Sequence, residues 1–233
     1  MQEGPHVEQP VWIALNGVRR IVLSCSPHDA AALVLGHLLA EGWIRSMADV
    51  ESLALSAADD EGGGPGVSAE IDPAQLDAAE LVRRHQTLHG CGVRHHLDCD
   101  PYAVPPVDSP ALPIDPVPLL RSLFAAADER APQGGVHAAG LSNGSGLVAV
   151  STDVARHSAM DRAIGLGLRD HGDLSTFGMV CTARISGAMA LKAVRARLGW
   201  IASRSIATSL AHEIAESHGL LLLERAARHP RDA

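Results

Sequence analysis

Apolar residues in the first part of the chain come in short runs that are separated by turn signals. Residues 11–15 and 20–23 are two such runs. Asn16-Gly17 between them tolerates the positive φ angles of a tight turn, which predicts a β-hairpin. An apolar helix is expected next, because Ser26 can act as its N-cap, a proline follows the cap, and Gly42 stands where the helix should stop.

The middle of the chain predicts a strand over residues 52–58 and a helix over residues 73–86. The segment 101–118 carries seven prolines without a clear period, which is typical of a linker. We therefore place a domain boundary there. The expected N-terminal domain is α+β and covers residues 1–100, and the C-terminal domain covers residues 119–233.

The C-terminal part begins with a helix and a hairpin and then alternates between strands and helices. Apolar runs at 136–141 and 147–151 predict the hairpin, and the side-chain oxygens of Ser151, Thr152 and Asp153 can cap a helix that begins near Val154. Further helices are expected at 119–130, 186–198 and 208–217, and strands at 177–182, 200–203 and 220–223. This order predicts a three-layer α/β domain within an α/β protein, with ligands at the carboxyl ends of the strands.

Composition narrows the class of protein. Asp and Glu outnumber Lys and Arg by 27 to 19, which argues against broad binding of nucleic acid. Aromatic residues make up only 3% of the chain, so the core must consist mainly of Ala, Val and Leu. No apolar run has the length of a membrane span, and the first residues lack the pattern of a signal peptide. We therefore expect a cytoplasmic protein that does not bind a membrane.

The cysteines are Cys25, Cys91, Cys99 and Cys181, and a reducing cytoplasm makes a disulfide framework the less favoured use for them. Cys91 lies between two glycines, with Arg94 and His95 close behind, and nearby cations favour the thiolate. It is the best candidate for a reactive cysteine, with an inert loop cysteine as the alternative. A metal site at Cys91, His95 and Cys99 stays open, although the spacing matches no common zinc motif. Cys25 is expected in the core.

Two cations, Arg156 and His157, fall in the first turn of a predicted helix, where they oppose the helix dipole. A bound anion would remove the conflict, and a solvated first turn is an equally good explanation of the spacing. Other polar residues that follow predicted strands are Arg184, Ser186, Ser205 and Thr208. Their shared placement favours a single site. The chain shows no P-loop, G-x-S-x-G or complete dinucleotide motif, which disfavours NTPase, hydrolase and dehydrogenase functions.

Several segments, in order, resemble the FdhD/NarQ family of sulfur carriers, which are accessory proteins of molybdenum-dependent formate dehydrogenase. The segments read ALNGVRRIVLSCSPHDAAALVLGHLLAEGWI, HGCGVRHH, GGVHAAG with TDVARHSAMDRAIG, TARISGAMALK and SIATSLAHEIA. The resemblance covers nearly the whole chain. It implies a sulfurtransferase that accepts persulfide sulfur from a cysteine desulfurase and hands it to the molybdenum cofactor, for formate dehydrogenase or a related molybdoenzyme.

The same resemblance implies which residues carry the function, with Cys91 as the persulfide cysteine. The positions that match the family's motifs around bis-molybdopterin guanine dinucleotide, a bound substrate, are Gly134, Gly135, His137, Asp153, Arg156, His157, Asp161, Arg184, Ser186, Lys192, Ser205 and Thr208. A cytidine-deaminase-like fold is implied for the C-terminal domain, together with a homodimer. No permanent metal is expected.

The chain also departs from the family pattern. Arg94 stands where the family has a second cysteine, so a relay between two thiols would need Cys99 instead. Other departures are Gln133, Thr152, Ala155, Ser158, Arg162, Ala188 and Ile206. The zinc-deaminase pattern is incomplete, because Ala159 and Arg184 replace its glutamate and second cysteine, so deamination is not expected. A second hypothesis is a chaperone that binds and inserts the cofactor without moving sulfur.

Overall fold

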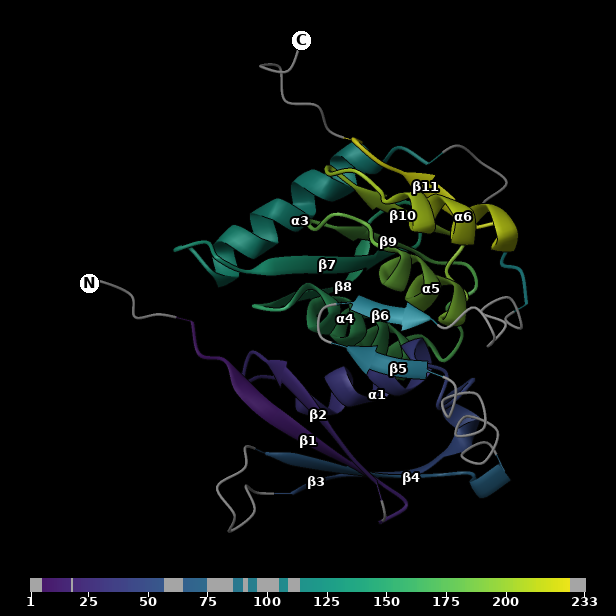
Figure 1. Cartoon of the computed structure of the whole chain (residues 1–233). Coiled ribbons are helices and arrows are strands. Elements are labelled where there is room, and N and C mark those ends of the chain that lie inside the picture. Colours follow the sequence, from purple (N-terminus) through teal and green to yellow (C-terminus); the bar gives the residue numbers. More distant parts are fainter. Residues whose placement is uncertain are drawn as a thin grey trace.

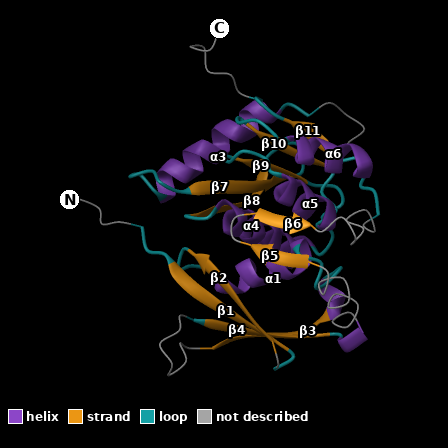
Figure 2. Ribbon diagram, in the orientation of Figure 1, coloured by secondary structure: helices purple, strands orange, loops and turns teal. Residues whose placement is uncertain are grey.

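The computed structural model describes residues 6–17, 19–56, 65–74, 86–89, 92–95, 105–108 and 114–226. Two larger sheets dominate the fold, with helices between them and above the upper sheet (Figures 1 and 2). The expected mixed α/β class is confirmed. Among the described residues, no helix combines the length and the apolar character that crossing a bilayer requires.

The N-terminal sheet has the strand order β2-β1-β4-β3. Its strands are β1 (Gln9–Leu15), β2 (Arg19–Cys25), β3 (Val50–Ser56) and β4 (Gly66–Ile71). Strands β1 and β2 form the expected hairpin, and Asn16 and Gly17 adopt φ angles of 46° and 67°. The side chain of Asn16 also bonds both backbone groups of Ile71, which ties the hairpin turn to the parallel neighbour β4.

Helix α1 (Ala30–Ala40) lies between this sheet and the rest of the molecule (Figure 1). The prediction that Ser26 caps it is wrong, because the helix begins only after Asp29, which has a φ of 46° and makes no capping side-chain bond. Ser26 instead accepts a hydrogen bond from the backbone N–H of Val154, far away in the sequence. Gly42, with a φ of 75°, marks the predicted end of the helix.

A short 3-10 helix, η1 (Met47–Asp49), leads into β3. Strands β5 (Gln86–His89) and β6 (Gly92–His95) pair antiparallel with each other. Gln86 therefore begins a strand, whereas the sequence pattern placed it at the end of a helix. Only Pro73 and Ala74 of that predicted helix are seen as helical, and residues 75–85 lie outside the described part of the chain.

The C-terminal sheet has the strand order β11-β10-β9-β7-β8. Its strands are β7 (His137–Ser142), β8 (Leu147–Asp153), β9 (Gly178–Cys181), β10 (Trp200–Ser203) and β11 (Leu221–Leu223). The helices around it are α3 (Pro116–Arg130), α4 (Arg156–His171), α5 (Gly187–Arg195) and α6 (Ser209–His218). Alternate residues of the strands face the two sides, so that Val180 packs with α3 whereas Met179 packs with the other helices. The sheet thus forms the middle of three layers.

Two helix boundaries differ from the sequence prediction for local reasons. Helix α3 starts three residues earlier than expected, because Asp115 caps it by accepting from the N–H of Val117, with Pro116 at the first position. Helix α5 ends at Arg195, because Arg197 adopts a φ of 60° that a helix cannot continue. The predicted division at residues 101–118 stays a prediction.

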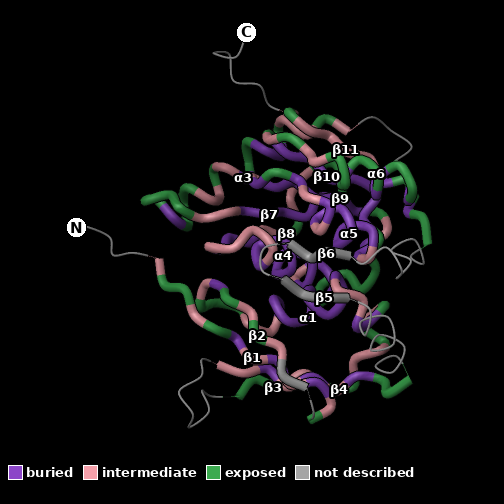
Figure 3. Tube along the Cα trace, in the orientation of Figure 1, coloured by how far each residue is buried: buried purple, intermediate pink, exposed green. Residues whose placement is uncertain are grey.

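Helices α1 and α4 cross at two glycines. A Cβ atom at Gly36 would lie 1.7 Å from the carbonyl oxygen of Asp161, and one at Gly165 would lie 1.8 Å from that of Ala32. Only glycine permits this backbone approach. The buried residues of the molecule concentrate around this crossing, in α1, α4, α5 and the neighbouring strands (Figure 3).

Replacing Gly36 with alanine is expected to lower the free energy of unfolding by at least about 1–3 kcal/mol, which is the usual cost of overpacking a core. Alanine has the higher helix propensity, so any loss reports the steric conflict. The matched control is Gly146→Ala, because a Cβ there would meet nothing within 4 Å. Urea unfolding should show the control within about 0.5 kcal/mol of the wild type. Equal stability of the two variants would contradict the close crossing.

Candidate functional site

The predicted ligand residues gather at one edge of the C-terminal sheet. Strands β9 and β10 are parallel, and β7 is antiparallel to both β8 and β9, so β8, β9 and β10 all end at the same edge. Strand β7 begins there, with His137 opposite Asp153. The predicted residues that the topology brings to this edge are Gly134, Gly135, His137, Asp153, Arg156, His157, Arg184, Ser186, Ser205 and Thr208. Their contact with a ligand stays a prediction.

The start of β7 offers an accessible stretch of backbone. Gly134 and Gly135 are exposed and adopt φ angles of 71° and 80°, which other residues rarely tolerate. The ring of His6, from the other end of the chain, lies beside this turn and bonds the carbonyl oxygen of Gly134. A Cβ at Gly135 would lie 3.3 Å from that ring. The turn therefore depends on glycine and can bring backbone groups close to a ligand.

Helix α4 begins at Arg156, and its N-cap, Ala155, supplies no capping side-chain bond. Asp153, which was expected to cap the helix, lies two residues before this N-cap. Its Oδ1 accepts from the N–H of Ala155 at 2.8 Å, while its Oδ2 is 2.6 Å from Arg162. The first N–H groups of α4 consequently have no capping side chain, and such N–H groups attract anions.

His157 carries a buried nitrogen, Nε2, with no hydrogen-bond partner among the described residues. Burial, together with the nearby cations Lys192 and Arg156, lowers the pKa of His157 from its ordinary 6.5 to about 4. The ring is therefore neutral at pH 7. A neutral imidazole can donate or accept at the unpaired nitrogen, depending on its tautomer. Burial and Arg156 also lower the pKa of His137.

Asp161 and Lys192, both predicted at the ligand site, form a buried ion cluster with residues of α1. The ammonium of Lys192 lies 2.7 Å from Asp161 and 2.8 Å from Glu41, and Nδ1 of His37 lies 3.0 Å from Asp161. Burial alone would raise the pKa of Asp161, but Lys192 and His37 hold it below its ordinary value. Burial would likewise lower the pKa of Lys192, and the two carboxylates raise it. The cluster joins the C-terminal end of α1 to α4 and α5.

Two further predicted residues are helix caps. Ser186 accepts from the N–H of Met189 at 3.4 Å at the start of α5, and Thr208 accepts from the N–H of Ala211 at 3.3 Å at the start of α6. The loop between β10 and α6 is fixed further where Ser205 donates its N–H to Ser203. Arg184, by contrast, is exposed. Hydrogen bonds thus fix the loops on either side of this site, and the exposed Arg184 lies in one of them.

Residues 6–231 match the profile of the FdhD/NarQ family. The chain belongs to this family. Sulfur carrier protein FdhD from Xanthomonas oryzae pv. oryzae (strain MAFF 311018) is 36% identical over 237 residues, which cover 98% of this chain and 83% of that protein. The protein of the same name from Variovorax paradoxus (strain S110) is 32% identical and covers 93% of this chain and 79% of its own length.

The fold of this family member also resembles a solved structure. A crystal structure of a protein described as a formate dehydrogenase accessory protein, from Desulfotalea psychrophila, aligns with a TM-score of 0.71. The two chains are 23% identical, and the alignment covers 95% of this chain and 84% of that chain. The likeness shows a shared fold. The cytidine-deaminase-like description of the C-terminal domain stays a prediction.

Two thiols of this FdhD/NarQ protein lie in the described part of the chain, and both are buried. Burial raises the pKa of Cys25 to about 11, with Asp153 adding to the rise, and burial raises that of Cys181 to about 12. Neither forms a thiolate readily at neutral pH. The predicted core position of Cys25 is confirmed.

The proposed reactive residues Cys91 and Cys99 lie outside the described residues. The backbone on either side of Cys91 is seen, with His89 of β5 paired to Gly92 of β6. The alternative metal site at Cys91, His95 and Cys99 falls in the same segment, so it stays a prediction. Within the ranges that the structure describes, no three His, Cys, Asp or Glu side chains are grouped so that they could hold a metal ion.

Sequence reasoning missed the partners of the buried ions, Glu41 and His37, and it missed the role of Arg162. A signal for the first two was present, since His37 interrupts the apolar helix α1 and Glu41 is the residue at its C-cap. Charged groups on a buried helix need a partner elsewhere in the fold. The local sequence does not show which distant residue that partner is.

Proposed function

We propose that this protein is a sulfur carrier that acts in the maturation of formate dehydrogenase. In this proposal, Cys91 receives sulfur from a cysteine desulfurase and passes it to the guanine dinucleotide form of the molybdenum cofactor. The observation that carries the proposal is the 36% identity, over 98% of this chain, to proteins named sulfur carrier protein FdhD. The client molybdoenzyme, the desulfurase and a homodimeric state belong to the proposal.

The state of the described thiols supports Cys91 as the carrier. A persulfide forms when a thiolate attacks the outer sulfur of a donor persulfide. The new S–S bond forms as the donor's S–S bond breaks, and the donor cysteine leaves as a thiolate, so no net oxidation is required. Cys25 and Cys181 are buried with raised pKa values and are poor attacking groups. Cys91, with its flanking glycines and nearby cations, has the composition of a reactive site.

Release of the sulfur requires two electrons, and a second thiol can supply them. A thiolate at Cys99 would attack the inner sulfur on Cys91, form a Cys91–Cys99 disulfide and release hydrosulfide for the molybdenum cofactor. Cys99 takes this role in our proposal because Arg94 occupies the position of the family's second cysteine.

The sheet edge supports a site for the phosphates of the guanine nucleotide. Gly134 and Gly135 provide accessible backbone, and the first turn of α4 has no capping side chain. Arg156 and Arg184 supply positive charge in a protein whose net charge is −8. His157 adds a neutral ring whose buried Nε2 has no partner in the described part of the structure. Backbone N–H groups at a helix start together with arginines are a common phosphate-binding combination.

A calorimetric titration with guanosine diphosphate tests this site. We expect the wild type to bind and Arg184→Ala to bind about 10- to 100-fold more weakly, since a hydrogen bond to a charged group contributes roughly 1.5–3 kcal/mol. The matched control is Arg169→Ala, which removes an exposed arginine paired with Asp170 in the last turn of α4. Absence of binding by the wild type, or equal loss in the control, would contradict the proposed site. Sulfur transfer is tested separately by replacing the cysteines one at a time.

A further inference from the structure

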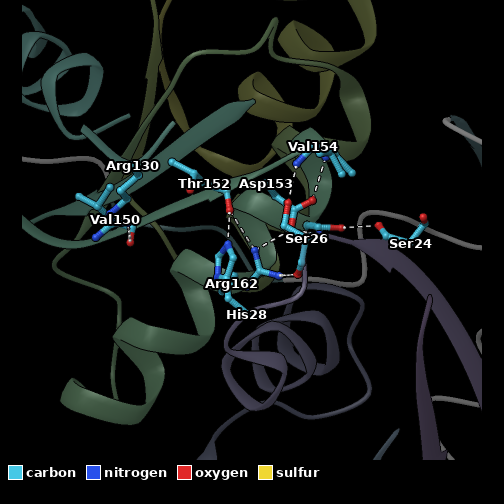
Figure 4. Close-up of polar contacts among 11 residues, drawn as sticks. Ser24, Ser26, His28, Arg130, Val150, Thr152, Asp153, Val154 and Arg162 are labelled. Atoms are coloured by element: carbon cyan, nitrogen blue, oxygen red, sulfur yellow. Dashed lines mark hydrogen bonds and ion pairs between the residues drawn. The ribbon is translucent and has the colours of Figure 1, made fainter. Parts of the chain in front are cut away.

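Arg162 connects two turns that are far apart in the sequence. It lies on α4 and is only 1% exposed. Its Nη1 donates to Asp153 Oδ2 at 2.6 Å and to the carbonyl oxygen of Thr152 at 3.1 Å, and its Nη2 donates to the carbonyl oxygen of Ser26 at 3.0 Å (Figure 4). One guanidinium thus holds the end of β8 and the turn between β2 and α1.

Ser26 holds the same two turns together from the other side. Its N–H donates to Asp153 Oδ2 at 3.0 Å, and its Oγ accepts from the N–H of Val154 at 3.2 Å (Figure 4). His28 bonds the carbonyl oxygen of Thr152 at 3.0 Å, and Ser158 donates to the carbonyl oxygen of Ser24 at 3.2 Å. We call these contacts the turn clamp.

The turn clamp includes Asp153, one of the predicted ligand residues, and adjoins the start of α4. Asp153 accepts from Ser26, Arg162 and Ala155, and Ala155 is the N-cap residue directly before Arg156. The carbonyl oxygen of Thr152 and the N–H of Val154 are therefore held by residues outside their own segment. The N–H of Ala155 is held by Asp153. A buried pair with this many hydrogen bonds is rigid, because moving either partner leaves a charge without compensation.

We propose that Arg162 and Ser26 are positioning residues, which hold the start of α4 so that Arg156 and His157 face the nucleotide. The inference rests on the proposed nucleotide site, and it makes the β2–α1 turn of the N-terminal half a part of that site. The fork of the guanidinium matters, because its bonds run to three acceptors on two chain segments. A lysine ammonium in its place cannot reproduce this geometry.

Ser26→Ala tests the proposal with little disturbance, because it removes the Oγ bond to Val154 and keeps the backbone contacts. We expect guanosine diphosphate to bind about two- to tenfold more weakly, the range of a single hydrogen bond, and Arg162→Lys to weaken binding by more. The matched control is Ser24→Ala, whose hydroxyl donates to Glu8 at the surface and whose carbonyl oxygen, the acceptor for Ser158, is retained. It should bind as the wild type does.

A second measurement does not need the ligand. NMR titration of the His157 ring is expected to show its pKa rising from about 4 toward 6.5 in Ser26→Ala, because a loosened turn admits water. An unchanged pKa together with wild-type affinity would overturn the positioning role. If the wild type does not bind guanosine diphosphate, the proposed site fails, and the His157 titration still decides whether the clamp holds the turn. Ser26→Ala also keeps the test valid if Arg162→Lys does not fold.

Discussion

Replacing Lys192 with methionine is expected to lower the free energy of unfolding by about 3–5 kcal/mol, the usual cost of removing one partner from a buried ion pair. Lys192 is 5% exposed, and its ammonium lies within 2.8 Å of both Asp161 and Glu41. Methionine fills a similar volume but leaves two buried carboxylates facing each other. Urea unfolding at neutral pH measures the loss.

The controls for Lys192→Met separate burial from charge. Arg169→Met removes a cation whose partner Asp170 is half exposed, so it should cost less than about 1 kcal/mol. Adding Asp161→Asn and Glu41→Gln to Lys192→Met should recover part of the stability, because the repelling carboxylates are then neutral. A Lys192→Met protein within about 1 kcal/mol of the wild type would show that the cluster is not a desolvated ion network.

Replacing Cys91 with serine is expected to abolish activation of formate dehydrogenase, because a serine hydroxyl cannot form a persulfide. Cys25→Ser and Cys181→Ser should retain activation, since both thiols are buried and have raised pKa values. The measurement is the formate dehydrogenase activity of a bacterium that lacks its own family member and expresses each variant. Western blotting shows that each variant accumulates.

Two outcomes of that experiment would change the assignment. Wild-type activity with Cys91→Ser would exclude sulfur transfer through this residue. If Arg156→Ala then abolished activity, the protein would be a chaperone that binds the cofactor without moving sulfur. Loss of activity in Cys99→Ser would support Cys99 as the second thiol, whereas full activity would remove that step from the proposal.

Much of the fold follows from local sequence signals. The Asn16-Gly17 dipeptide specified the first hairpin, because few other residue pairs adopt its φ angles. Thr208 and Ser186 specified the starts of α6 and α5 through their own hydroxyl groups. The helix start at Ser26 was predicted wrongly because this side chain bonds Val154, a partner 128 residues away. Local signals cannot reveal such a long-range competitor.

Part of the candidate site could also be predicted from the sequence. Residues that follow parallel strands meet at one edge of a sheet, so the grouping of Arg156 with Arg184 and Thr208 follows from the order of elements. The buried partners of Asp161 did not follow from that order. His37 is 124 residues from Asp161, and its contact depends on the close crossing at Gly36 and Gly165. Burial and long-range pairing are properties of the packed fold.

Sulfur transfer through Cys91 is tested most directly by mass spectrometry of the purified protein after incubation with a cysteine desulfurase and cysteine. We predict that the peptide containing Cys91 gains one sulfur atom, that a reducing agent removes it, and that the peptides containing Cys25 and Cys181 gain none. Failure of Cys91 to gain sulfur, or accumulation of sulfur on Cys25 or Cys181 instead, would contradict the role of Cys91 as the sulfur carrier.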